Sequence, residues 1–185
     1  MPLKGLAEAD AIRLVTEDYG LTGKKEELAH FVNQMGRHPL LMQLVSSWMR
    51  EELGEGVCVT EAENLGLDLF TVEGYHHDTE TCVKEVVTAS LARLSARLGD
   101  ILKRLSVLRG IFDLGLAQGL TAEVTEADLR YLARLSLLQE FPPEPKEGKR
   151  RRFQFLPLIQ MFVQQQADSE VLRSARLVKP CGTLL

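Results

Sequence analysis

The sequence contains few of the residues that mark secreted or membrane-spanning proteins. Its 185 residues include only three cysteines, Cys58, Cys82 and Cys181, with no regular spacing. An odd number of scattered cysteines argues against a disulfide framework and favours a reducing compartment. No apolar run approaches the roughly 20 residues that a membrane-spanning helix needs, and the N-terminus lacks the charged and apolar segments of a secretory signal. We therefore expect a cytoplasmic protein with no membrane partner.

A phosphate-binding loop is missing as well. Such a loop needs Gly-x-x-x-x-Gly-Lys followed by Ser or Thr, because its backbone N–H groups and its lysine hold the phosphates. The nearest string, residues 20–25, reads GLTGKK, with the wrong spacing and no hydroxyl after the lysines. His30 and His38 have no evident nucleophile partner in the sequence. The sequence therefore predicts neither a catalytic residue nor a cofactor bound by this chain alone.

Aromatic residues are scarce, at 6%, and neither sign of charge dominates strongly. The apolar residues nevertheless amount to 45% of the chain, which is enough to bury a core in one domain or two small ones. The formal net charge is −4 at pH 7. An overall negative charge argues against a chain that binds nucleic acid through its general electrostatics.

The apolar residues of the first third recur with helical spacing. We expect helices over residues 7–19, 25–35 and 39–53, the last opened by Pro39, whose missing N–H is tolerated in a first turn. Together they define a helical subdomain over residues 1–53. The positions expected on the buried faces of the second and third helices are Leu28, Phe31, Val32, Met35, Leu41, Leu44, Val45 and Trp48.

The helical period is lost over residues 54–80, which are rich in glycine and polar residues. We interpret this stretch as a linker between two subdomains and as a hinge. The period returns over residues 81–167, where Gly99 is expected to separate two helices. Residues 168–185 show little pattern, and we expect a flexible tail there.

The second subdomain, residues 81–167, combines helices with a predicted β-hairpin. Thr125 to Asp128 resembles a capping box, and Leu129, Leu132 and Ala133 would form the buried face of the helix that follows. Two short strands, residues 137–141 and 152–156, flank a Pro/Gly-rich loop, and Pro157 begins a last helix. Helices followed by a hairpin are typical of a winged helix. The predicted fold is mainly α, with a small helical subdomain followed by a winged-helix subdomain.

The order of these parts resembles the second half of the NB-ARC type of STAND signalling ATPases. The resemblance covers residues 3–53 and 82–166, and its motifs are LKGLAEADA (3–11), GRHPLL (36–41), the stretch 129–138 and FQFLPLI (153–159). In that family a nucleotide-binding domain precedes a small helical domain and a winged-helix domain. The resemblance implies a fragment or degenerate product without the catalytic domain.

The resemblance also implies a role for the chain. It would be a non-catalytic regulatory module that controls nucleotide-dependent switching and oligomerisation. Its partners would be its own or a partner's nucleotide-binding domain and, on activation, other protomers. ADP or ATP would be bound by the intact parent protein.

The turn between the second and third helices is the candidate site. In the family, the proline of this turn packs against the adenine of the bound nucleotide, which implies that role for Pro39. A rigid ring offers an apolar surface to a flat base, and Gly36 allows close backbone approach. The alternative is purely structural: Gly36 ends one helix and Pro39 begins the next, without a ligand.

One position departs from the family pattern. The family commonly places a histidine just before the Pro-Leu-Ile segment, where it contacts the β-phosphate of ADP and locks the resting state. Leu156 occupies this position here. A leucine side chain cannot donate a hydrogen bond to phosphate, so nucleotide sensing through this position is in doubt.

Other interpretations of the sequence remain open. Residues 76–82 contain several potential metal ligands, but their spacing matches no zinc pattern, and we expect no metal site. The basic residues 146–152 could make the chain a winged-helix DNA-binding regulator. Against that, the presumed recognition helix begins with Glu126 and Asp128, which would repel phosphates, so we expect little affinity for DNA. A plain protein-interaction scaffold is the third possibility.

The missing phosphate-binding loop leads to a direct prediction. The purified chain should show no ATPase activity above a buffer blank, with or without magnesium, because it has no group to hold the β- and γ-phosphates. Release of inorganic phosphate from ATP is the measurement. Turnover that copurifies with the protein through several columns would contradict this expectation.

Overall fold

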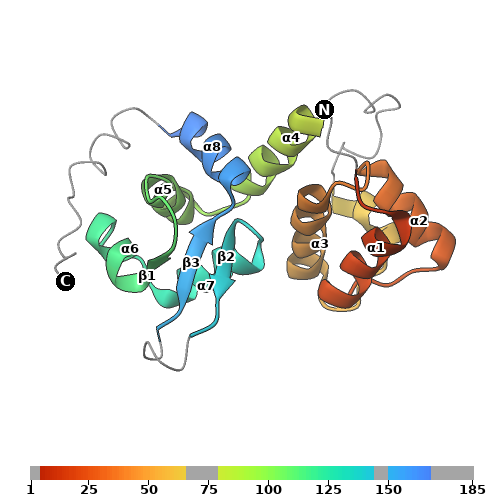
Figure 1. The fold of residues 1–185 in the computed structure, drawn as a ribbon, viewed down its shortest axis with the longest axis horizontal. Coiled ribbons are helices and arrows are strands. Elements are labelled where there is room, and N and C mark those ends of the chain that lie inside the picture. The colour runs from red at the N-terminus through yellow and green to blue at the C-terminus, as the bar shows by residue number, and fades with distance from the viewer. Residues whose placement is uncertain (1–4, 66–78, 144–149, 168–185) are drawn as a thin grey trace. The chain divides into compact units, whose positions relative to one another are not determined.

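A computed structural model describes residues 5–65, 79–143 and 150–167 of the chain (Figure 1). These residues are mainly helical, as the sequence predicts, and they include one small three-stranded antiparallel sheet. The chain divides into two compact units, Met1–Ser90 and Leu91–Leu185. The predicted tail, 168–185, and the second half of the predicted linker, 66–78, lie outside the described residues. No helix in the described ranges is both long and apolar enough to cross a membrane.

The first unit is built from helices, and its elements follow the predicted order. The expected helix over residues 7–19 is an α-helix that continues into one π-helical turn. Every position predicted for the buried faces of the second and third helices is buried. The elements of the unit are α1 (Glu8–Arg13), η1 (Leu14–Asp18), α2 (Lys25–Gln34), α3 (Pro39–Leu53), η2 (Val59–Leu65) and α4 (Thr79–Ala92), which crosses the division between the units.

Residues 54–62 differ from the expected linker because they pack into the first unit. Thr22 makes two backbone hydrogen bonds with this segment. Its N–H donates to the Val57 carbonyl (2.9 Å), and its carbonyl accepts from the Val59 N–H (2.8 Å). Val57, Val59 and Ala62 are buried. The stretch shows no helical period because a single bridge and a 3₁₀ turn position it.

The second unit surrounds the small sheet. β1 (Phe112–Asp113) and β2 (Leu138–Phe141) both pair antiparallel with β3 (Arg152–Phe155), which lies between them. The predicted hairpin is formed by β2 and β3, with Leu138 opposite Phe155 and Phe141 opposite Arg152. β1 has no counterpart among the elements predicted from the sequence. The elements are α5 (Ala96–Leu105), β1 (Phe112–Asp113), α6 (Leu114–Leu120), α7 (Glu126–Arg134), β2 (Leu138–Phe141), β3 (Arg152–Phe155) and α8 (Pro157–Gln166).

One sequence prediction about the second unit was wrong. Gly99 does not separate helices but lies inside α5, which begins after Ser95, whose side chain accepts from Leu98 N. A serine oxygen that satisfies a free N–H group marks a helix start more strongly than a glycine marks an end. In α8, Met161 is exposed, and Ile159, Phe162 and Val163 form the buried face.

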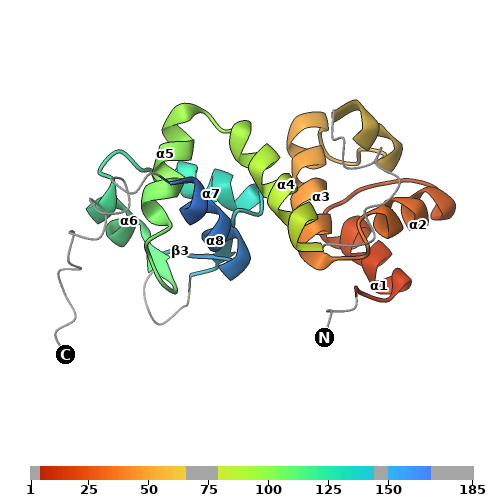
Figure 2. The same ribbon diagram turned by 90° about the horizontal axis from the view of Figure 1, so that it is seen from above.

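Aromatic side chains and buried hydrogen bonds hold the second unit together. Phe112 of β1 lies 6.3 Å, between ring centroids, from both Phe153 and Phe155 of β3, and all three are buried. α8 lies beside α5 (Figure 2). Gln160 donates from Nε2 to the carbonyls of Ser106 (2.6 Å) and Leu108 (2.7 Å). Gln164 Nε2 also donates to the Ser106 carbonyl (2.5 Å), so two glutamines of α8 satisfy carbonyl groups just after α5.

An ion pair between Arg97 and Asp128 joins the starts of α5 and α7. Asp128 also belongs to the predicted capping box. Both terminal nitrogens of Arg97 donate to Asp128, at 2.8 Å each, and one also donates to the Glu123 carbonyl. Asp128 also accepts from the backbone N–H (2.9 Å) and the hydroxyl (2.7 Å) of Thr125, the N-cap of α7. These hydrogen bonds, that from Arg97 above all, hold the pKa of Asp128 far below its usual range.

Asp128→Asn should lower the free energy of unfolding at pH 7 by about 1–2 kcal/mol, because the variant loses charge-assisted hydrogen bonds and part of the cap. The lowered pKa of Asp128 means that its contribution is present above its unfolded pKa of about 3.9 and fades as pH falls below that value. Chemical denaturation at pH 7 and near pH 3 measures both effects. Asp100→Asn, at an exposed position of α5, is the control. Equal losses in the two variants would contradict the assignment.

Candidate functional site

The turn between α2 and α3 reverses the chain with two consecutive left-handed residues. Gly36 has φ +58° and Arg37 has φ +55°. The Gly36 N–H donates to the Asn33 carbonyl (2.9 Å), the Arg37 N–H to the Val32 carbonyl (2.9 Å), and the His38 N–H to the Met35 carbonyl (3.1 Å). The last carbonyls of α2 are therefore satisfied within the turn, as at many helix ends.

The predicted site residues lie on opposite sides of this reversal. Gly36 closely follows the end of α2, and Pro39 is the first residue of α3, after His38 as N-cap. Both Gly36 and Pro39 are exposed. The turn thus presents a rigid apolar ring next to accessible backbone, an arrangement that suits contact with a flat apolar group.

The N-terminal segment braces the turn, a feature that the sequence did not reveal. The Leu6 N–H donates to the Arg37 carbonyl at 2.9 Å. A Cβ atom on Gly5 would lie 2.3 Å from the Gly36 carbonyl oxygen and 3.0 Å from the Arg37 Cβ. Only glycine fits at position 5 with this packing, because that separation lies far inside van der Waals contact. In the sequence, Gly5 appears only as a glycine three residues before a helix start, and nothing there indicates which backbone packs against it.

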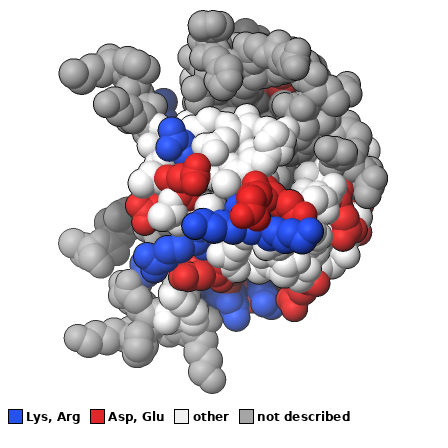
Figure 3. Space-filling view, turned by 90° about the vertical axis from the view of Figure 1, so that its right-hand side faces the viewer, with Lys and Arg blue, Asp and Glu red and all other residues white. Residues whose placement is uncertain are grey.

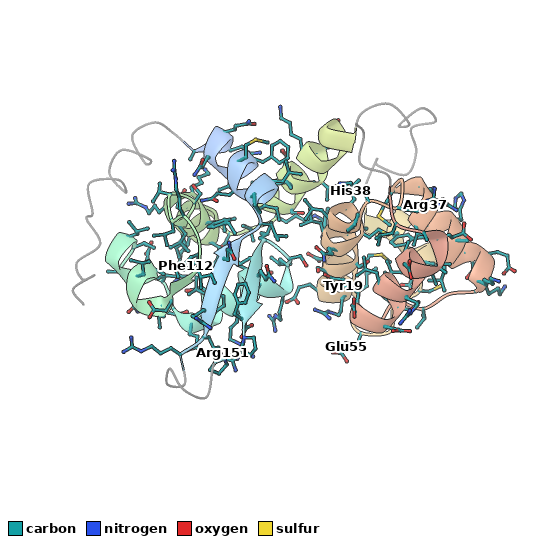
Figure 4. The ribbon with its side chains drawn as sticks, viewed as in Figure 1. Tyr19, Arg37, His38, Glu55, Phe112 and Arg151 are labelled. Atoms are coloured by element: carbon teal, nitrogen blue, oxygen red, sulfur yellow. The ribbon has the colours of Figure 1, made fainter. Side chains whose placement is uncertain are left out.

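His38 is the titratable group of the turn, and Figure 4 shows it beside Arg37. Its Nδ1 atom is buried and accepts or donates no hydrogen bond among the described residues. Burial lowers the pKa of His38. Its position at the N-terminus of α3 also disfavours a positive charge, because the helix dipole is positive there. The neutral imidazole is therefore the form that the fold accommodates.

The other residues singled out from the sequence lie in the second unit or outside the described residues. Leu156 is the half-buried N-cap of α8 in the second unit, and its carbonyl accepts from Gln160 N (2.9 Å). His76, His77 and Asp78 lie outside the described residues, so the expectation that they form no metal site stays a prediction. Within the described ranges, no three His, Cys, Asp or Glu side chains gather as a metal site requires.

Two basic residues of the hairpin are engaged in ion pairs. Arg150 lies 3.6 Å from Asp113 of β1, and Arg151 lies 3.3 Å from Glu126 of α7 and also pairs with Glu140 of β2. The lysines of this cluster, at positions 146 and 149, lie outside the described residues. The pairing of Arg151 with Glu126 brings the hairpin to the start of α7.

Comparison with known proteins adds no assignment. No model of a protein family matches the chain, and no curated protein matches it. A functional assignment therefore depends on the residues of the turn, the order of the elements and the distribution of charge.

Replacing His38 by glutamine should reduce the dependence of stability on pH between about pH 7 and 5. The sign follows from the lowered pKa of His38: its contribution is present above the unfolded pKa of about 6.5 and is lost as pH falls below that value, because the unfolded chain binds the proton more tightly. Thermal unfolding across this range is the measurement.

The control for this experiment is His30→Gln, at an exposed position of α2. It should leave the pH dependence of the wild-type chain largely intact. Two results would contradict the prediction: an equal loss of the pH dependence of stability in both variants, or an unchanged pH dependence in His38→Gln. Either would mean that the burial of His38 does not cause the loss of stability at acidic pH.

Proposed function

We propose that this chain is a non-catalytic regulatory module of a STAND-type signalling ATPase of the NB-ARC kind. Within the parent, it would control nucleotide-dependent switching and oligomerisation. The observation that carries the proposal is the turn at residues 36–39, in which α2 and α3 present an exposed proline beside a left-handed glycine. The sequence motif that resembles the family is thus accessible on the first unit.

The order of elements in the second unit supports the same proposal. A helix, a strand, two helices and a hairpin follow one another, and the first strand pairs with the last to give the order β1–β3–β2. This is the plan that we expect for a winged-helix domain. A small helical unit followed by a winged-helix unit is the arrangement that follows the nucleotide-binding domain in these ATPases.

In this proposal, a separate nucleotide-binding domain and this chain contact different parts of the nucleotide. Without a phosphate-binding loop, the phosphates of ADP or ATP would be held by a nucleotide-binding domain, and Pro39 would cover the adenine. The module would hold that domain closed with ADP and move away as a rigid body on activation, so that protomers can assemble. Leu156 offers no hydrogen bond to a phosphate, so in this proposal the second unit contributes packing to the closed state rather than a nucleotide contact.

The test compares ADP binding in two contexts. The isolated chain should bind ADP no better than millimolar, because burying one proline ring contributes only about 1–2 kcal/mol, less than the cost of immobilising a ligand. Joined to its nucleotide-binding domain, the protein should bind ADP more tightly, and Pro39→Ala should weaken that binding by about tenfold. Calorimetry on the joined protein and NMR titration of the isolated chain provide the affinities.

The matched control is Pro157→Ala. Pro157 is also an exposed first residue of a helix, α8, so the substitution changes the same group in the same local structure. Both variants should lose little stability, because alanine is tolerated at a helix start. An unchanged ADP affinity in Pro39→Ala would mean that this proline only begins a helix, and an equal loss in Pro157→Ala would mean that the effect is not local to the turn.

A further inference from the structure

The packing around Gly5 excludes a side chain for a reason other than the conformation of the glycine itself. Six of the described glycines have a positive φ, which favours glycine at any site, and Gly5 is not among them. What excludes a side chain at position 5 is the Gly36 carbonyl oxygen, which would lie 2.3 Å from a Cβ atom. No other described glycine would bring a Cβ within 3.0 Å of a backbone atom. The segment before α1 is therefore fitted closely against the turn between α2 and α3.

One peptide group of the turn is hydrogen-bonded on both of its edges. The Arg37 carbonyl accepts from the Leu6 N–H at 2.9 Å. The His38 N–H, which belongs to the same peptide group, donates to the Met35 carbonyl at 3.1 Å. Because a trans peptide group is planar and its C=O and N–H point in opposite directions, these two bonds leave it little freedom to rotate. The N-terminal segment thus orients the peptide group that directly precedes the His38–Pro39 bond.

Arg37 needs this support because its backbone conformation is unfavourable for a residue with a Cβ atom. Its φ of +55° lies in the left-handed region. Such a conformation persists only where the surrounding contacts fix it. The contacts here are the bond from the Arg37 N–H to the Val32 carbonyl and the bond that the Arg37 carbonyl accepts from Leu6. If the second bond were lost, Arg37 could leave the left-handed region, and Pro39, two residues later, would move with it.

The contact that this geometry orients is apolar. Pro39 is exposed at the start of α3 and carries no N–H group. On the face of the first unit that Figure 3 shows, basic side chains lie among acidic ones, and pairs such as Arg13–Glu17 and Lys24–Glu27 balance each other. That face is not uniformly basic, so it offers no extended surface for phosphates. The part of a nucleotide that suits the turn is therefore the flat base.

We infer that Gly5 and Leu6 are positioning residues for the base contact at Pro39. We call their contacts with Gly36 and Arg37 the N-terminal brace. This inference rests on the function proposed above, because the base contact is part of that proposal. Gly5 and Leu6 do not touch the nucleotide but act through the peptide group that precedes His38, whose orientation decides where the proline ring points. By thermodynamic linkage, ADP that binds to the ordered turn also stabilises the N-terminal brace.

Calorimetry on the chain joined to its nucleotide-binding domain tests the inference. Gly5→Ala should weaken ADP binding by about three- to tenfold, because a displaced ring loses the contact that Pro39→Ala removes. Binding of pyrophosphate should not change, because pyrophosphate has no base. The double variant of Gly5→Ala and Pro39→Ala should bind ADP no more weakly than Pro39→Ala alone, since both changes remove one interaction.

The matched control is Gly99→Ala in α5. Gly99 also lacks a positive φ, but a Cβ there would meet nothing within 4 Å. This variant should leave the affinities for ADP and pyrophosphate unchanged.

Hydrogen exchange tests the N-terminal brace in the chain by itself. In Gly5→Ala, the Leu6 and Arg37 amides should exchange at least about tenfold faster than in wild type. The Thr22 amide, which bonds to the Val57 carbonyl over the same 2.9 Å, should keep its rate. In the wild-type joined protein, ADP should slow exchange of the Leu6 amide, a measurement that needs no substitution and stands even if Gly5→Ala fails to fold.

The outcomes separate this inference from the proposed function. A loss of ADP affinity in Pro39→Ala but not in Gly5→Ala would overturn the inference and leave the proposed function in place. Unchanged ADP affinity in Pro39→Ala would overturn both. Equal weakening of ADP and pyrophosphate binding by Gly5→Ala would show a general loss of folded protein and would overturn the inference, as would a Leu6 exchange rate that does not respond to ADP.

Discussion

The first unit depends on one sharp reversal, made by two left-handed residues between α2 and α3. Gly36 adopts this conformation without strain, but Arg37 has a Cβ and does so at a cost of about 1–2 kcal/mol. The backbone of Arg37 is fixed on both sides, through its N–H to Val32 and its carbonyl to Leu6. Gly5 makes the second of these contacts possible. The reversal, the N-terminal segment and the exposed Pro39 therefore form one structural feature, on which the ligand contact proposed for Pro39 would depend.

The second unit depends on charge pairs that join separate elements. Arg97 and Asp128 fix the starts of α5 and α7 to each other, and Arg151 and Glu126 fix the hairpin to α7. The same pairs place a guanidinium beside each of the two carboxylates in the first turn of α7.

Much of the local structure could be predicted from single residues. Pro39 and Pro157 begin helices, Thr125 and Asp128 cap α7, and Phe153 and Phe155 lie on the buried face of a hairpin strand. Each of these signals acts within a few residues along the chain, where backbone sterics and local hydrogen bonds dominate. The candidate turn could be located for the same reason, because a glycine end and a proline start are local features.

What the sequence by itself determined is the order of the helices and the hairpin, the position of the turn and the absence of a phosphate-binding loop. Only the tertiary structure decided which distant groups meet. β1 is a strand because Phe112 pairs with Phe153, residues 57–62 pack into the first unit because Thr22 bonds to them, and Gly5 must be glycine because the Gly36 carbonyl approaches it. It also decided which charges cancel, since Arg97 meets Asp128 only after α5 and α7 have packed. Composition counts charges along the chain, but the electrostatic field at a surface depends on distances of a few ångströms that folding alone sets.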